Sequence, residues 1–104
     1  MKRSLLALAC LLWALPASAL NYTGVITKLH LNRNVTDRGV CFRMGDSIPT
    51  STGWACIFNP TQHLYDQMTS MVLTAHATGH TCKFWWDQEN TAGHAIVYIL
   101  ECDS

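Results

Sequence analysis

Four cysteines that follow residue 40 constrain the fold of this chain more than any other feature. They are Cys41, Cys56, Cys82 and Cys102, and the fifth, Cys10, lies in a segment that we expect to be removed. An even number of cysteines in a short exported chain is typical of a disulfide-bonded domain. Four cysteines allow three connectivities. The simplest one pairs neighbours along the chain, 41 with 56 and 82 with 102.

The N-terminal segment has the layout of a secretory signal peptide. A short basic start is followed by the apolar run Leu5–Leu15 and by Pro16–Ala19, which offers a cleavage site with small residues. The apolar run is too short to cross a bilayer as a helix. We therefore expect residues 1–19 to be a signal peptide and residues 20–104 to be one domain. The short basic start fits a bacterial signal as well as a eukaryotic one, and in a bacterium the domain would be exported to the periplasm and then secreted.

The 85 residues that remain are slightly acidic. Lys2 and Arg3 leave with the signal peptide, so 5 basic and 7 acidic residues stay, and the net charge is about −2 with neutral histidines. Nucleic acid is not an expected partner, because binding phosphates requires a basic face. No later segment is apolar enough for membrane insertion. The length allows one modest core and excludes large catalytic folds such as a doubly wound sheet.

The hydrophobic pattern predicts a mainly β domain with one helix. The first strand alternates, with Val25, Thr27, Leu29 and Leu31 on one face. The five expected strands are Tyr22–Leu31, Val40–Met44, Trp54–Phe58, Thr81–Trp86 and His94–Cys102. With the helix between strands three and four, this is the order of a five-stranded OB-fold barrel. A small α+β sandwich shares the order.

The expected helix carries two apolar stripes. It is predicted to start with Asn59 as N-cap and Pro60 in the first position, and to end at Gly79. The first stripe, which we expect to face the core, holds Leu64, Met68, Met71, Val72 and Ala75. The second holds Tyr65, Thr69, Leu73 and His76. A helix buried all round would explain both stripes, but a domain this small favours a second stripe that faces another subunit.

No motif for catalysis or for metal binding stands out, so we expect no catalytic residues, no metal and no cofactor. His76 and His80 have the spacing of ligands on one helix face, but Gly79 interrupts that helix. No pair among the carboxylates is selected by its spacing. Two alternatives stay open: a secreted OB-type domain that binds or inhibits a protein through Trp85 and Trp86, and a small secreted hydrolase.

The chain resembles the receptor-binding B subunits of one-A-five-B bacterial toxins, which include those of subtilase cytotoxin and typhoid toxin. The matching segments, in order, are Tyr22–Thr27, Cys41, Ala55–Cys56, Leu64–Gln67, Ala77–Gly79 and Lys83–Trp86. The resemblance implies an OB-fold subunit in a homopentamer. The helices of such a ring line a channel that receives the tail of a catalytic A subunit. The second stripe, with Tyr65, Thr69, Leu73 and His76, would face that channel.

The resemblance also implies a non-enzymatic function, the binding of sialylated host glycans on the flank of each subunit. Thr23, next to Tyr22, stands where the family has a serine that contacts the sugar. Asp46 is the nearest match to an acidic contact residue. Trp86 stands where a relative has a tyrosine, and Lys83 has the charge to complement a sugar carboxylate. These five residues are the predicted sialoglycan-binding site.

Overall fold

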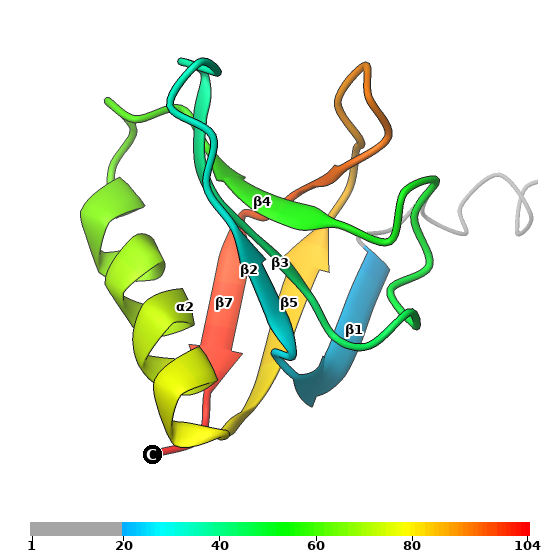
Figure 1. The fold of residues 1–104 in the computed structure, drawn as a ribbon, viewed down its shortest axis with the longest axis vertical. Coiled ribbons are helices and arrows are strands. Elements are labelled where there is room, and N and C mark those ends of the chain that lie inside the picture. The colour runs from blue at the N-terminus through cyan, green and yellow to red at the C-terminus, as the bar shows by residue number, and fades with distance from the viewer. Residues whose placement is uncertain (1–19) are drawn as a thin grey trace, which may run out of the picture.

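The computed structural model describes residues 20–104 (Figure 1), so the predicted signal peptide, residues 1–19, lies outside the described residues. The described part is mainly β with one helix. In chain order its elements are β1 (Leu20–Val25), β2 (Lys28–His30), β3 (Arg38–Arg43), β4 (Ala55–Phe58), α2 (Tyr65–Thr78), β5 (Thr81–Trp86), β6 (Ala95–Ile96) and β7 (Ile99–Cys102). No helix among residues 20–104 is long and apolar enough to cross a membrane.

The strands form two separate sheets, which do not close into a barrel. One sheet has the order β1-β5-β7, and the other has the order β2-β3-β4-β6. All neighbours are antiparallel except β4 and β6. The chain crosses between the sheets four times, and the first and last crossings, after Val25 and before Ile99, fall within expected strands. The first and last of the five expected strands are therefore each broken in two, and the structure has seven strands.

The break in the first expected strand comes from a change in which side chains face the core. Ile26 is buried, with 2% of its surface exposed, and Leu29 packs against the same core. Val25 and Leu31 are exposed, so the predicted common face of residues 25, 27, 29 and 31 is wrong. Thr27 fixes the bend: its backbone N–H donates to the Arg43 carbonyl at 2.8 Å, and its Oγ1 accepts from the Gly45 N–H at 2.7 Å.

The core lies between the two sheets and is closed on one side by α2 (Figure 1). Its aromatic centre is Phe84, which packs edge-on against Phe42 at 5.2 Å and stacks on Trp86 at 5.1 Å between ring centroids. Phe42 comes from β3 and Phe84 from β5, so this contact joins the two sheets. Aromatic pairs of this kind add to the stability gained from burying apolar surface.

Both predicted disulfides are confirmed. Cys41–Cys56 joins β3 to β4, and Cys82–Cys102 joins β5 to β7, in each case between residues that face each other in the sheet. The bridges span 15 and 20 residues along the chain. Closing a loop of 15 residues stabilises a domain by about 3 kcal/mol in the chain-entropy model. Two disulfides are typical of proteins outside the reducing cytoplasm.

The helix begins at Tyr65, five residues after the predicted start at Pro60. Asn59 has a φ of 60°, which is incompatible with the extended conformation of an N-cap. Residues 60–64 form turns, and Leu64, also left-handed at φ 65°, precedes the helix. The predicted end is confirmed: Gly79, with φ 72°, donates its N–H to the Ala75 carbonyl.

The face of α2 that packs on the core differs from the predicted stripe. Val72 and Ala75 are buried, and Met68 packs against the core as predicted. Tyr65, which was placed in the second stripe, belongs to this face as well. Leu64 and Met71 are exposed, so their prediction as core residues is wrong. Leu64 lies outside the helix, and Met71 lies about 100° around the helix axis from Val72, at the border of the inward face.

Candidate functional site

The outer face of the β1-β5-β7 sheet holds the candidate site. Strand alternation sends every second side chain outward. Thr23 lies opposite Lys83, and Lys83 lies opposite Glu101, so these three residues form one row across the sheet. Trp85 and Ile99 face each other in the next row of the same face. The row therefore joins a hydroxyl, a cation and a carboxylate, with an indole beside them.

A cavity of about 290 Å³ lies over this row. Its walls come from all three strands and from the segment after β7. The lining residues are Thr23, Thr81, Cys82, Lys83, Glu101, Cys102 and Asp103. The structure thus brings together Thr23 and Lys83, two of the five predicted ligand-binding residues. The Cys82–Cys102 disulfide fixes the register of β5 against β7, which sets Lys83 against Glu101.

Lys83 is held by an aromatic ring rather than by an acid. Its Nζ lies 4.9 Å from the ring centroid of Trp85. Across residues 20–104 the structure contains one ion pair, between Arg43 and Asp46, so Lys83 forms no ion pair with Glu101, which lies opposite it. A cation over an indole gains about 0.5–1 kcal/mol at exposed sites. The ammonium group is therefore positioned and still free to meet a ligand carboxylate.

Three other predicted contact residues lie away from this cavity. Tyr22 points to the inner side of the sheet and packs against the core. Trp86 is 0% exposed, and its indole Nε1 is buried without a hydrogen-bond partner in the described residues. It is therefore closed to a ligand in this chain. Asp46 is on the surface, with 96% of its side chain exposed, and pairs with Arg43 at 3.2 Å.

Sequence reasoning missed Glu101, Asp103 and Trp85 as members of this surface. The resemblance implied Trp86 as the contact residue, whereas alternation in β5 turns Trp85 outward and Trp86 inward. The signal for Glu101 was present in the sequence. If 82 and 102 are bridged across an antiparallel pair, the neighbours Lys83 and Glu101 must face each other.

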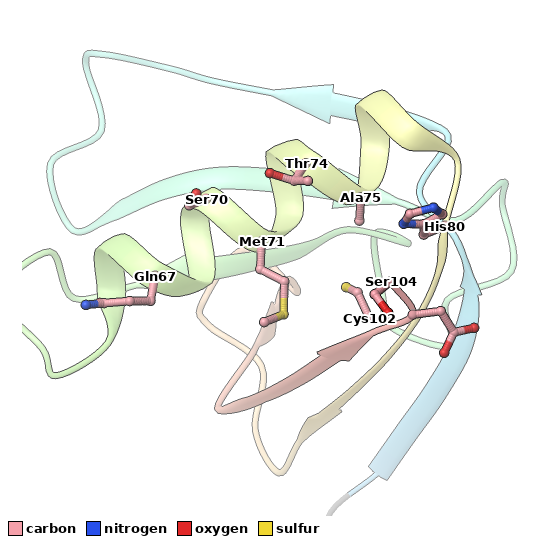
Figure 2. A pocket seen from close by; sticks show the side chains of 9 residues that line it. Gln67, Ser70, Met71, Thr74, Ala75, His80, Cys102 and Ser104 are labelled. Carbon is pink, nitrogen blue, oxygen red and sulfur yellow. The ribbon is translucent and has the colours of Figure 1, made fainter.

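A second hollow, of about 590 Å³, lies between α2 and the C-terminal end of β7 (Figure 2). Met71 points from the helix toward β7, and Ala75, His80 and Cys102 line the far end. Its lining is largely apolar and contains none of the predicted ligand-binding residues.

The predicted channel-facing residues divide into two groups. Tyr65 and Thr69 are half-buried, and the Thr69 hydroxyl donates to the Tyr65 carbonyl at 2.9 Å. Leu73 and His76, one and two turns further on, are exposed. The structure therefore leaves the C-terminal half of this stripe open to solvent and packs the N-terminal half on its own chain.

The described residues offer no site for a metal. Among residues 20–104 no three side chains of His, Cys, Asp or Glu lie close enough together to hold an ion. All four cysteines of this part of the chain are in disulfides. Compared with known protein families, curated proteins and solved structures, the chain has no match.

Proposed function

We propose that this protein is a non-enzymatic B subunit of a secreted bacterial toxin that binds sialylated glycans, as the resemblance of its sequence implies. The observation that carries the proposal is the row of Thr23, Lys83 and Glu101 under one cavity. The resemblance assigns Thr23 to the sugar, and Lys83 was predicted beside it because its charge would complement a sugar carboxylate.

The chemistry of this row suits an acidic sugar. The Lys83 ammonium, which forms no ion pair in the described residues, would pair with the carboxylate of a terminal sialic acid. The Thr23 hydroxyl both donates and accepts hydrogen bonds, and the Glu101 carboxylate accepts them from sugar hydroxyls. The Trp85 ring offers an apolar surface for the less polar face of the sugar. A cavity of about 290 Å³ limits the contact to a single sugar unit.

We also propose that the fold is of the OB type. Joined across their breaks, β1 with β2 and β6 with β7 give two long bent strands. The first long strand then pairs with β3, β3 pairs with β4, and β4 pairs with the last long strand. β5 lies between the last long strand and the first and pairs with both. This is the neighbour order of a five-stranded, partly open barrel with its helix after the third strand. The interruptions at the bends separate it into two sheets.

Assembly into a homopentamer that carries a catalytic A subunit is the third part of the proposal. Three large apolar residues in or next to α2 remain exposed in the single chain: Leu64 at 47%, Met71 at 39% and Leu73 at 41%. A ring that buries them would gain their hydrophobic contribution. Five weak sugar sites would also gain avidity on a glycan-covered surface. Secretion through the predicted signal peptide agrees with the two disulfides.

Two measurements on the purified protein test the proposal. Native mass spectrometry is expected to show a pentamer, and a glycan array is expected to show sialosides among the bound sugars. Thr23→Ala should weaken sialoside binding without changing the mass of the assembly. Thr36→Ala, which removes an exposed hydroxyl from the loop before β3, is the matched control. A monomer that binds no sialoside would defeat the proposal and favour the alternative of a secreted protein-binding domain.

A further inference from the structure

The outer face of the β2-β3-β4-β6 sheet gathers most of the positive charge of the described chain. Lys28 lies opposite Arg43 and His30 lies opposite Cys41 in the sheet, so their side chains share this face. Arg38 and His94 border the same region. Residues 20–104 contain 5 lysines and arginines against 7 acids. Three of those 5 lie here, although the domain as a whole is acidic.

A cavity of about 240 Å³ opens among these cations. It is lined by His30, Arg38, Cys41, Trp54 and His94, and no acidic residue contributes to its wall. The basic side chains come from three separate places in the chain: β2, the start of β3 and the turn before β6. Of the basic groups nearby, Arg43 is committed to Asp46 and to the face of Trp54. Arg38 has no ion pair within residues 20–104.

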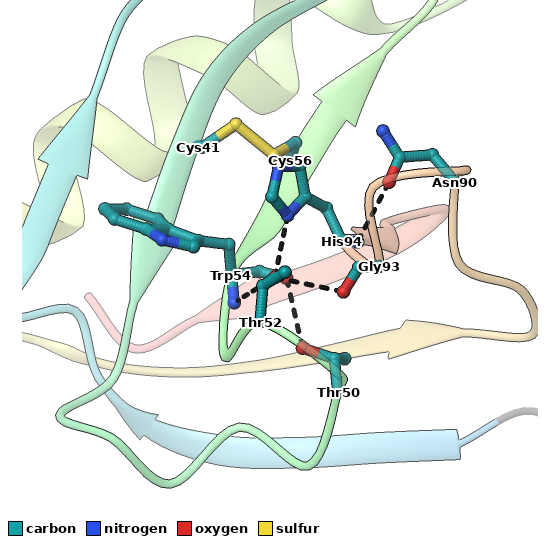
Figure 3. Close-up of a disulfide and its surroundings, with 8 residues drawn as sticks. All are labelled: Cys41, Thr50, Thr52, Trp54, Cys56, Asn90, Gly93 and His94. Carbon is teal, nitrogen blue, oxygen red and sulfur yellow. Dashed lines mark hydrogen bonds between the residues drawn. A yellow bond between two sulfur atoms is a disulfide. The ribbon is translucent and has the colours of Figure 1, made fainter.

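The floor of the cavity is apolar and is cross-linked by a disulfide. The Cys41–Cys56 disulfide and Phe58 form a small buried cluster, against which Trp54 and Ile96 pack. Figure 3 shows the disulfide and the His94 ring side by side, with Trp54 on the same surface. Charged groups beside such an apolar floor attract an opposite charge more strongly than they would in bulk water.

Hydrogen bonds fix the orientation of the His94 imidazole. Its Nδ1 lies 2.7 Å from Thr52 Oγ1, and its backbone N–H donates to Asn90 Oδ1 at 2.9 Å (Figure 3). The Thr52 hydroxyl also lies 3.0 Å from the Gly93 carbonyl, to which it donates. In the charged imidazole both ring nitrogens carry a proton, so His94 then donates from Nδ1 to Thr52 and offers Nε2 to a ligand.

We propose that this cavity is a binding site for an oxyanion, a sulfate, phosphate or carboxylate group, held by Arg38, His30 and His94. The guanidinium would form a bidentate contact, and the two imidazoles would each add one charge-assisted hydrogen bond. This site is separate from the Thr23–Lys83 surface, and it does not rest on the function proposed above.

The mutual repulsion of the cations around the cavity agrees with this assignment. Burial first, and then the charges of Arg38 and His30, lower the pKa of His94. These cations repel each other as long as no anion is present. A bound oxyanion would neutralise Arg38 and favour the charged form of both histidines, so binding should strengthen as the pH falls below 6.5, the usual pKa of histidine.

The test is a titration of the purified protein with sodium sulfate at constant ionic strength, followed by the NMR signals of the histidine rings. Sulfate is expected to shift the ring signals of His94 and His30 and to leave the ring signals of exposed His63 unchanged. Arg38→Gln should weaken binding by at least about tenfold, because it removes the bidentate, charge-assisted contact. Arg33→Gln removes the same charge from the neighbouring loop and should bind as the unmodified protein does. His30→Gln, at an exposed position, gives a second variant that keeps the fold.

A second arm of the titration identifies where the anion comes from. N-acetylglucosamine 6-sulfate carries the same group on a sugar. Tighter binding than inorganic sulfate would show that the site takes an anion attached to a sugar, and equal binding would show a site for the free ion. If neither probe moves His94 or His30 more than His63, or if Arg38→Gln binds sulfate unchanged, the proposal is overturned.

Discussion

At the scale of single residues, Gly39 is required by a close approach between β3 and α2. A Cβ added at this position would overlap the Tyr65 hydroxyl and lie 2.9 Å from Tyr65 Cζ. Gly39→Ala should therefore displace Tyr65 and destabilise the domain by about 1–3 kcal/mol, the usual cost of overpacking. The midpoint of urea unfolding measures this loss.

The partner in this contact provides the control for Gly39→Ala. Tyr65→Phe removes the nearest atom, the hydroxyl, and keeps the ring. The loss from Gly39→Ala should be smaller in the Tyr65→Phe background than in the unmodified chain, which a double-mutant cycle measures. Equal losses in the two backgrounds would show that the clash with the hydroxyl is not the cause.

His94 gives the domain a pH-dependent stability. Burial, with smaller contributions from Arg38 and His30, lowers its pKa in the folded state below the usual 6.5. The unfolded chain then binds a proton more readily than the folded one. This contribution to stability is complete above pH 6.5, is lost as the pH falls from 6.5 toward the lowered pKa, and is constant below it.

Urea unfolding between pH 7.5 and pH 5, in buffers without sulfate or phosphate, measures the effect of His94. His94→Gln should flatten the fall in stability on the acid side, while His63→Gln, at an exposed position, should leave it unchanged. An unaltered pH dependence in His94→Gln would show that another group is responsible.

At the scale of elements, the end of α2 depends on a backbone conformation that favours glycine. Gly79 has φ 72°, and no atom lies within 4 Å of a Cβ placed there. Gly79→Ala should therefore cost about 1–2 kcal/mol from backbone strain alone. Gly79→Asn should cost less, because asparagine tolerates the left-handed region. Thermal unfolding of both variants measures the difference, and equal losses would contradict a backbone origin.

The end of α2 was predictable and its start was not, for a physical reason. A glycine after an apolar stripe is a strong stop signal, because few other residues adopt its positive φ. Asn59 and Pro60 have the composition of a helix start, but asparagine also adopts the left-handed region, as it does here at φ 60°. Turn formation at residues 60–64 then delayed the helix to Tyr65.

Strand positions were predicted well, but the bends within the strands were not. Alternation identifies extended residues, yet it does not show where a strand leaves one sheet for the other. The inward residues Ile26 and Leu29 are three apart, and this interruption of the period marks the bend. The same limit affected the candidate site. Lys83 and Thr23 were identified from sequence, whereas Glu101 and Trp85 depended on pairing and on the choice of face.

At the scale of the whole molecule, the exposed apolar surface of α2 is the feature that a single chain does not explain. Met71, 39% exposed, borders the hollow between α2 and β7, whereas Leu73, 41% exposed, lies on the opposite flank of the helix, away from Ala75. Burial of large side chains contributes about 25 cal/mol per Å² of apolar area. The chain therefore gains stability if a second copy covers this face, as the proposed ring would.

A charge placed on this face tests the ring. Leu73→Lys should leave the fold of the single chain intact, because Leu73 makes little contact with the core, but it should bring like charges together if the helices surround a channel. The Leu73→Lys assembly should then fall apart at protein concentrations at which the unmodified assembly stays intact. Added salt should restore the Leu73→Lys assembly, since salt screens the repulsion.

Leu31→Lys, at a position 68% exposed after β2, is the matched control and should assemble normally. Sedimentation at several protein and salt concentrations measures both variants. If Leu73→Lys and Leu31→Lys dissociate over the same range of protein concentration, the Leu73 side of α2 does not line a channel in the assembly.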